Sequence, residues 1–72
     1  MGKLYECTEA IILLYGNNKD EAEKKEIGKG SFWILDGFYA DGHVQLTNYN
    51  SGFTVYINYM VFKDYFSFYK DL

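Results

Sequence analysis

The sequence predicts a mainly β domain, a small antiparallel barrel of about five strands with a short C-terminal helix. Short β-prone stretches recur up to residue 57, and turn signals rich in Gly, Asn and Asp separate them. Helical spacing of aromatic residues appears only after residue 58. A sheet of sequential hairpins loses its exposed edges when it closes into a barrel. Because 72 residues fit one domain, we expect residues 1–72 to form a single unit.

The N-terminal part combines an apolar stretch with a charge-dense segment. Residues 4–8 are β-prone, and the apolar run at residues 11–15 predicts a strand buried on both faces. The Gly-Asn-Asn sequence at residues 16–18 indicates a turn. Residues 19–29 allow two interpretations, a helix capped by asparagine or an exposed loop that leads into a strand near residues 24–27. A helix here would have almost no apolar face to hold it against a core, so we favour the loop and the strand.

The strongest predicted strand follows the Gly-Lys-Gly turn at residues 28–30. It spans residues 31–35, where bulky apolar side chains are continuous. Since side chains alternate between the two faces of a strand, we expect Phe32 and Ile34 to face inward and Trp33 to face outward.

Two further strands are predicted from period-two alternation. Either of the two Asp-Gly dipeptides between residues 36 and 42 suits the tight turn that leads into residues 43–47. A five-residue hairpin loop at residues 48–52 then leads into residues 53–57. The alternation of the two strands places five apolar side chains inward: Val44, Leu46, Phe53, Val55 and Ile57.

The end of the chain changes period. Four aromatic residues recur at helical spacing, namely Phe62, Tyr65, Phe66 and Tyr69, and Asn58 precedes them as an N-cap. This pattern predicts the short C-terminal helix.

Composition and charge limit the class of protein. The 15 aromatic residues (Tyr 8, Phe 6, Trp 1) give so short a chain the bulky side chains that its core needs. Cys7 is the sole cysteine, so no intramolecular disulfide can form, and no apolar run reaches the length of about 18 residues that a membrane span needs. We expect a soluble cytoplasmic protein. Seven lysines, ten carboxylates and no arginine give a net charge of -3, and the missing guanidinium groups disfavour sequence-specific recognition of DNA.

No residue pattern fits a particular chemistry. Nucleophilic catalysis would need a base beside Cys7, and His43 is the sole histidine, so we interpret them as a semi-buried thiol and a solvent-facing strand residue. Asp36 and Asp41 lack the spacing of a calcium loop and suit Asp-Gly turns instead. The turn at residues 28–31 lacks the spacing of a phosphate-binding loop. We therefore predict a protein that is not an enzyme and that has no catalytic residue, metal site or cofactor.

The layout of the middle of the chain resembles that of SH3-like barrels. The resemblance covers residues 24–62: Lys29-Gly30 enters Phe32-Trp33-Ile34-Leu35, Gly42-His43-Val44-Gln45-Leu46 follows, and a hairpin leads into residues 53–57. The chain has no Ala-Leu-Tyr-Asp-Tyr stretch, and Trp33 has no tryptophan neighbour, so the resemblance implies the barrel and not its site for proline-rich peptides. The small size and the Lys/Asn/Tyr/Phe-rich composition are similar to those of small proteins of phages and mobile elements in low-GC Gram-positive bacteria.

The surplus of aromatic residues is the strongest functional signal. A small barrel cannot bury 15 rings. Strand alternation is expected to leave at the surface some of six aromatic side chains, namely Trp33, Phe38, Tyr39, Tyr49, Tyr56 and Tyr59. One interpretation is that these rings pack under the terminal helix or the charged segment. The other is an exposed patch that binds a protein partner or a second copy. On the second interpretation, we predict a non-catalytic interaction module that acts as an accessory or inhibitory protein. It would bind its partner through Trp33, Phe38, Tyr39 and Tyr56.

Two alternative functions remain on sequence grounds. Small barrels bind single-stranded nucleic acid by stacking bases on aromatic rings along a positive groove, and the rings fit this function while the charge disfavours it. An acidic protein can also occupy the nucleic-acid site of another protein, and ten carboxylates permit such mimicry.

Overall fold

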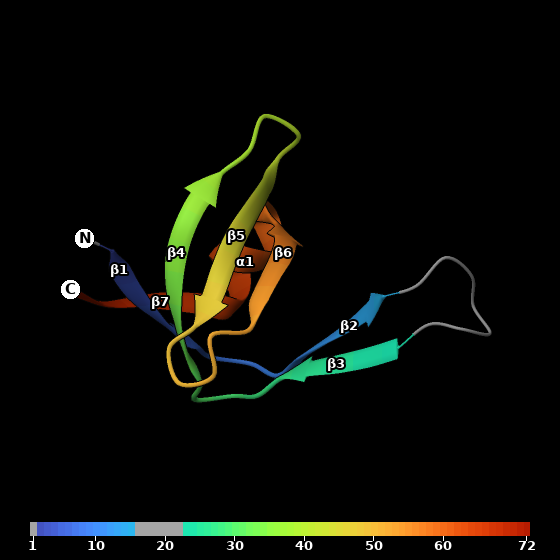
Figure 1. The fold of residues 1–72 in the computed structure, drawn as a ribbon, viewed down its shortest axis with the longest axis horizontal. Coiled ribbons are helices and arrows are strands. Elements are labelled where there is room, and N and C mark those ends of the chain that lie inside the picture. The colour runs from blue at the N-terminus through green and yellow to red at the C-terminus, as the bar shows by residue number, and fades with distance from the viewer. Residues whose placement is uncertain (1, 16–22) are drawn as a thin grey trace.

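The structure is a computed structural model that describes residues 2–15 and 23–72 (Figure 1). It is mainly β, as the sequence predicts. In chain order its elements are β1 (Lys3–Cys7), β2 (Ile11–Tyr15), β3 (Glu23–Ile27), β4 (Phe32–Phe38), β5 (His43–Asn48), β6 (Thr54–Asn58), α1 (Tyr59–Tyr65) and β7 (Phe66–Asp71). The turn expected at residues 16–18 lies outside the described residues.

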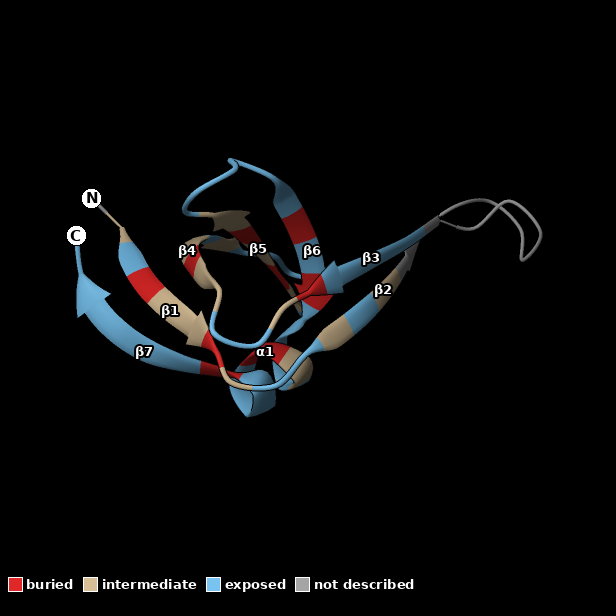
Figure 2. Cartoon of the chain, turned by 90° about the horizontal axis from the view of Figure 1, so that it is seen from below, coloured by how far each residue is buried: buried red, intermediate tan, exposed pale blue. Residues whose placement is uncertain are grey.

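The main sheet has five antiparallel strands in the order β6-β5-β4-β1-β7, and β2 and β3 pair as a separate two-stranded sheet. Figure 2 shows that the main sheet bends around its core while the β2–β3 ribbon extends away from it. The expected closure of the sheet into a barrel is wrong, because β6 and β7 form the two ends of the strand order. Helix α1 joins these two end strands and packs against both, where a closed barrel would hydrogen-bond them to each other.

The C-terminal helix is shorter than predicted, and the chain ends in a strand. The Asn58 N-cap is confirmed, since its side chain accepts a hydrogen bond from Met60 N at 2.7 Å. The helix ends at Tyr65 because Phe66 is already extended and β7 pairs with β1. Pairing along β1 supplies β7 with backbone hydrogen bonds that a continued helix would have made within itself.

The core lies between the inner face of the main sheet, α1 and the base of the β2–β3 ribbon. Among the residues whose burial is described, its buried side chains are Cys7, Ile27, Trp33, Val44, Leu46, Val55, Ile57, Phe62 and Phe66. The inward positions predicted for Val44, Leu46, Val55 and Ile57 are confirmed.

The predicted orientation of β4 is wrong. Trp33 is only 4% exposed and belongs to the core, and its indole Nε1 donates a hydrogen bond to Ser31 Oγ at 2.8 Å. Phe32 and Ile34 instead point to the outer face, where Leu4 is buried against them. A one-residue change of register exchanges the two faces of a strand, and a strand that is apolar on both faces does not reveal which face is inward.

Two predictions about the ribbon have opposite outcomes. The strand predicted within the charged segment is confirmed as β3. The double-sided burial of β2 is wrong, since Ile12 is 64% exposed. Ile11 and Leu13 pack against the core, whereas Ile12 between them points to the opposite face of the ribbon, which is open to solvent.

The hairpin turns follow the glycine and asparagine signals. Of the two Asp-Gly dipeptides, Asp41-Gly42 forms the turn, with Gly42 at φ +87°, while Asp36-Gly37 lies at an irregularity within β4. The predicted five-residue loop is confirmed, and Asn48 Oδ1 accepts hydrogen bonds from two backbone N–H groups within it. These turns fix which residues of β4, β5 and β6 lie side by side.

Candidate interaction surface

Four exposed aromatic residues gather where β4 turns into β5 and β6 runs into α1. They are Phe38, Tyr39, Tyr56 and Tyr59, which we call the aromatic tip, and they are 63%, 45%, 55% and 42% exposed. The hairpin that carries the first two residues stands clear of the remaining elements in Figure 1. Three of the four predicted binding residues therefore lie together.

The backbone places these rings in two pairs on opposite faces of the sheet. Tyr39 and Tyr56 lie on the outer face with ring centroids 5.3 Å apart. Phe38 pairs in register with Val44 on the inner face, where its ring lies 5.8 Å from that of Tyr59. A hydrogen bond from Tyr59 N to Gly42 O at 2.9 Å ties the start of α1 to the turn between β4 and β5.

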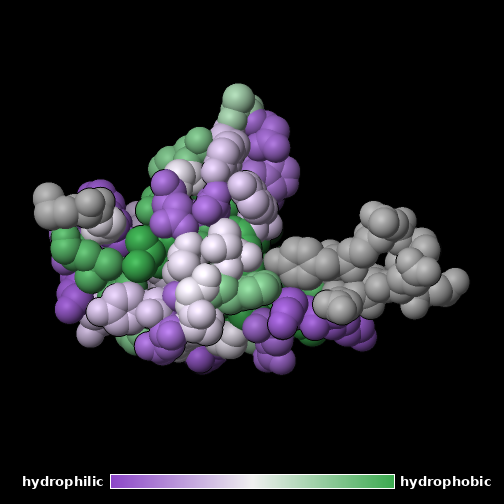
Figure 3. Space-filling view, in the orientation of Figure 1, coloured by the Kyte–Doolittle hydropathy of each residue, from purple (hydrophilic) through white to green (hydrophobic). Residues whose placement is uncertain are grey.

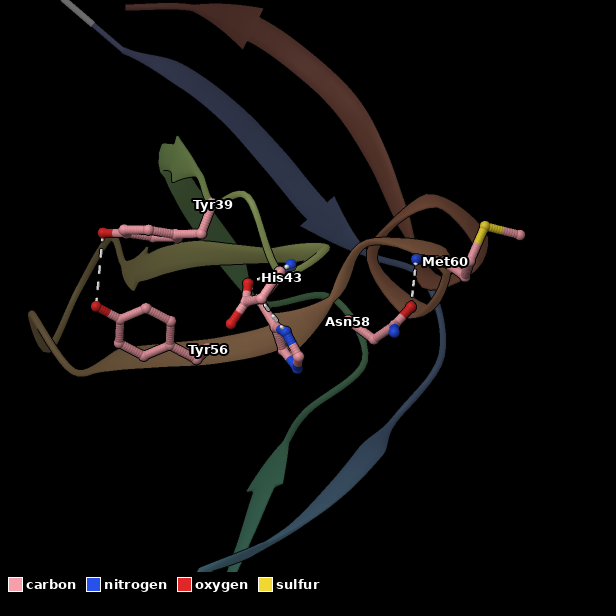
Figure 4. Close-up of polar contacts among 6 residues, drawn as sticks. Tyr39, His43, Tyr56, Asn58 and Met60 are labelled. Atoms are coloured by element: carbon pink, nitrogen blue, oxygen red, sulfur yellow. Dashed lines mark hydrogen bonds and ion pairs between the residues drawn. The ribbon is translucent and has the colours of Figure 1, made fainter.

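Hydrogen bonds orient the outer pair. The Tyr39 hydroxyl donates to Gln45 Oε1 at 2.6 Å. The Tyr56 hydroxyl donates to that of Tyr39 at 3.5 Å (Figure 4). The contact with Tyr56 raises the pKa of Tyr39, and partial desolvation and the negative charge of Asp36 act in the same direction. Tyr39 therefore presents an uncharged phenol at neutral pH.

The sole histidine lies beside the tip. Asp41 Oδ1 accepts a hydrogen bond from His43 N at 3.1 Å and lies 3.3 Å from His43 Nδ1 (Figure 4). His43 shares the outer face with Tyr56, whereas Cys7 is buried in the core on the other side of the sheet. The structure therefore does not bring the thiol and the imidazole together.

Cys7 has the environment of a structural thiol. Its Sγ donates a hydrogen bond to Glu9 O at 2.9 Å, and burial raises its pKa. A thiol that is buried and protonated is a poor nucleophile. Over the part of the chain that the structure describes, no three His, Cys, Asp or Glu side chains form a group that could hold a metal ion.

Trp33 does not belong to the tip, contrary to the prediction. It lines a cleft of about 330 Å³ between the β2–β3 ribbon and the loop after β5. Phe53 lies at the mouth of this cleft, 39% exposed and not buried as expected, with Lys25 Nζ 5.0 Å from its ring centroid. The interpretation that an aromatic ring packs beneath the charged segment thus holds for Trp33, because Lys25 and Ile27 of β3 line the same cleft.

A second group of exposed rings escaped the sequence analysis. A hollow of about 180 Å³ on the outer face is lined by Leu4, Phe32, Tyr49, Tyr69 and Lys70. The aromatic residues between positions 66 and 69 could have indicated this group of rings. The sequence instead predicts a helix there and an inward Phe32, so it does not predict that Phe32 and Tyr69 meet. Figure 3 shows hydrophobic residues near the two chain ends, where β1 and β7 lie in Figure 1.

The comparisons with known proteins leave the function open. The chain matches no protein-family model, no curated protein and no solved structure with which it was compared. None of the helices in the described ranges is long and apolar enough to cross a membrane. The function is therefore inferred from the residues and their geometry.

Proposed function

We propose that the domain is a non-catalytic protein-interaction module and that the aromatic tip anchors its partner. The observation that carries this proposal is the exposure of two ring pairs at one end of the main sheet, one pair on each face, of which the outer pair is held by hydrogen bonds. Aromatic side chains supply large contact areas at low entropic cost, and tyrosine is enriched at the energetically dominant positions of interfaces. Rings that are oriented before binding lose less entropy on binding.

The exposed area of the tip is smaller than a stable interface needs, so the tip is the centre of a larger contact surface. Each pair of rings, at roughly 200 Å² per ring and about half exposed, offers about 200 Å² on its face of the sheet, whereas a stable interface uses about 800 Å² per partner. Met60 follows the tip in the chain and is 58% exposed, so it extends the apolar area onto α1. The partner is thus a protein surface with an apolar centre and polar groups that can hydrogen-bond to phenols.

The proposal includes a fold that is related to SH3-like barrels. The meander β4–β5–β6 of a strongly bent sheet supports an SH3-like arrangement that stays open between β6 and β7. The small size and Lys/Asn/Tyr/Phe-rich composition support an accessory or inhibitory role in a phage or mobile element. The partner would then be a cytoplasmic bacterial protein.

The experiment compares two double variants that each remove two exposed large side chains. Tyr39→Ala/Tyr56→Ala removes the outer pair of the tip, and Ile12→Ala/Tyr65→Ala removes two exposed side chains that line neither the tip nor the hollow. Each protein is immobilised and incubated with a nuclease-treated Gram-positive lysate, and retained proteins are quantified by mass spectrometry. We expect at least one protein to be retained by wild type and by the second variant but lost from the first.

Two controls make the outcome interpretable. Fluorescence of Trp33, the only tryptophan, reports whether each variant is folded. Sedimentation of wild type and of the tip variant tests whether the partner is a second copy. Retention of the same proteins by both variants would contradict the proposal, and so would tip-dependent binding of a labelled single-stranded oligonucleotide at low salt without any protein partner.

A further inference from the structure

The hollow on the outer face lies at the opposite end of β4 from the aromatic tip. Phe32 begins β4 and lines the hollow, whereas Phe38 ends β4 and belongs to the tip. The two residues are six positions apart along the strand, or roughly 20 Å. The aromatic hollow, defined by its lining residues Leu4, Phe32, Tyr49, Tyr69 and Lys70, is therefore a separate feature of the surface.

Neighbouring strands and one hydrogen-bonded loop hold the walls of the aromatic hollow. Leu4 is 3% exposed and pairs with Lys70 across β1 and β7. The rings of Phe32 and Tyr69 meet edge to face with centroids 4.8 Å apart. Tyr49 N donates a hydrogen bond to Phe32 O at 2.9 Å, which ties the loop after β5 to the start of β4. The hollow is thus built into the fold.

The volume of the aromatic hollow limits its occupant to one large side chain. Sites for whole small molecules enclose roughly 300 to 1,000 Å³, and this hollow offers about 180 Å³. Its lining of rings and an aliphatic side chain suits an apolar or aromatic group. An apolar side chain of a bound peptide meets both conditions.

One lysine supplies the only charge of the lining. Among the described residues no carboxylate lies within ion-pair distance of Lys70 Nζ, while the nearby Lys3 is paired with Asp71 at 3.4 Å. A carboxylate next to the bound side chain would therefore meet an ammonium group that pairs with no carboxylate of the described residues. We propose that the aromatic hollow binds a large apolar side chain of a peptide at a position next to a carboxylate, which pairs with Lys70.

This inference goes beyond the proposed function and does not depend on the aromatic tip. The probes are N-acetyl-phenylalanine, its neutral carboxamide and N-acetyl-alanine, titrated into the ¹⁵N-labelled protein and followed by NMR. N-acetyl-phenylalanine is expected to give saturable shifts at the lining residues at millimolar concentration. The carboxamide is expected to bind about two- to five-fold more weakly, the range of an exposed ion pair.

Variants separate the contribution of apolar contacts to probe affinity from the contribution of the Lys70 charge. Lys70→Gln should abolish the difference between acid and carboxamide and leave carboxamide binding unchanged. Tyr69→Ala should weaken both probes, since it removes a wall of the hollow. Lys63→Gln, which removes an exposed lysine of α1, is the matched control and should preserve the preference for the acid. Tyr39→Ala should change neither affinity.

Several outcomes would overturn the inference. Equal affinity for the acid and the carboxamide would show that Lys70 does not pair with the carboxylate. A preference for the acid that survives in Lys70→Gln would show the same. Shifts that map to the aromatic tip, or an equal response to N-acetyl-alanine, would remove the role of the hollow. Absence of saturable shifts at millimolar probe would refute binding altogether. Added salt should reduce the preference for the acid, because an exposed ion pair is screened.

Discussion

The rings of Tyr39 and Tyr56 lie 5.3 Å apart although Tyr39 directly follows β4, Tyr56 belongs to β6, and β5 lies between these two strands. Gln45 of the intervening strand accepts the hydrogen bond from the Tyr39 hydroxyl at 2.6 Å, and Gln45 is also the register partner of Tyr56. Three neighbouring segments thus position two exposed rings. Exposed side chains are usually free to change rotamer, so this arrangement is the feature that distinguishes the aromatic tip from a scattered set of surface rings.

The raised pKa of Tyr39 predicts a pH dependence at the alkaline end. A folded-state pKa above the unfolded value means that the native state holds the phenol proton longer. The stabilisation is complete below the unfolded pKa of about 10 and is lost as pH rises through the higher folded value. We expect the unfolding free energy of wild type to fall more steeply above about pH 10 than that of Tyr39→Phe. Urea unfolding between neutral and alkaline pH measures the difference, and parallel pH profiles would contradict the prediction.

The burial of Trp33 predicts a large cost of truncation. Trp33→Ala should lose about 3 to 5 kcal/mol of unfolding free energy, because it leaves a cavity in the core. Ser31→Ala should lose about 1 kcal/mol or more, since it removes the acceptor of the indole N–H. Tyr56→Ala, a matched exposed ring, should lose less than about 1.5 kcal/mol. Thermal and urea unfolding give these values. A near-neutral Trp33→Ala would mean that Trp33 faces solvent, as the sequence alone suggested.

The contrast between β4 and β5 explains how much of the fold the sequence predicts. In β5, polar residues alternate with Val44 and Leu46, so the inward face is determined by the pattern itself. In β4, four consecutive apolar residues give no such contrast, and the face is decided by what packs on each side. Leu4 covers one side and the β2–β3 ribbon covers the other, and neither contact is visible in the sequence of β4.

The last strand and the candidate surfaces show the same limit. Four of the aromatic residues after Asn58 satisfy a helical period, yet Phe66 and Tyr69 among them belong to β7 because β1 offers a pairing edge. The surplus of aromatic residues predicted that some of Phe38, Tyr39 and Tyr56 lie at the surface, but their gathering with Tyr59 depends on the β4–β5 hairpin and the start of α1. The aromatic hollow combines four separate segments, so only the tertiary structure reveals it.

The Asn58 cap predicts a specific contribution to stability. Asn58→Ala should lose about 1 kcal/mol, since Met60 N loses its acceptor and α1 has only seven residues to hold it in place. Asn58→Asp should retain the stability, because aspartate also caps and its charge favours a helix N-terminus. Asn50→Ala in the exposed loop is the control and should stay within about 0.5 kcal/mol of wild type. Equal losses for Asn50→Ala and Asn58→Ala in urea unfolding would show that the cap contributes nothing particular.

The burial of Cys7 predicts a thiol that reacts only when the protein opens. Its side chain is fully buried, and its raised pKa keeps the thiolate fraction low at neutral pH. Native protein should react with a thiol reagent at least about a hundredfold more slowly than urea-unfolded protein, because the reagent must wait for unfolding. In the variant Cys7→Ala/Ser67→Cys the thiol moves to an exposed position of β7 and should react at nearly the unfolded rate. Rapid reaction of native Cys7 would show instead that the junction of β1, β4 and β7 opens readily, and the core packing described for Trp33 and Phe66 would have to be revised.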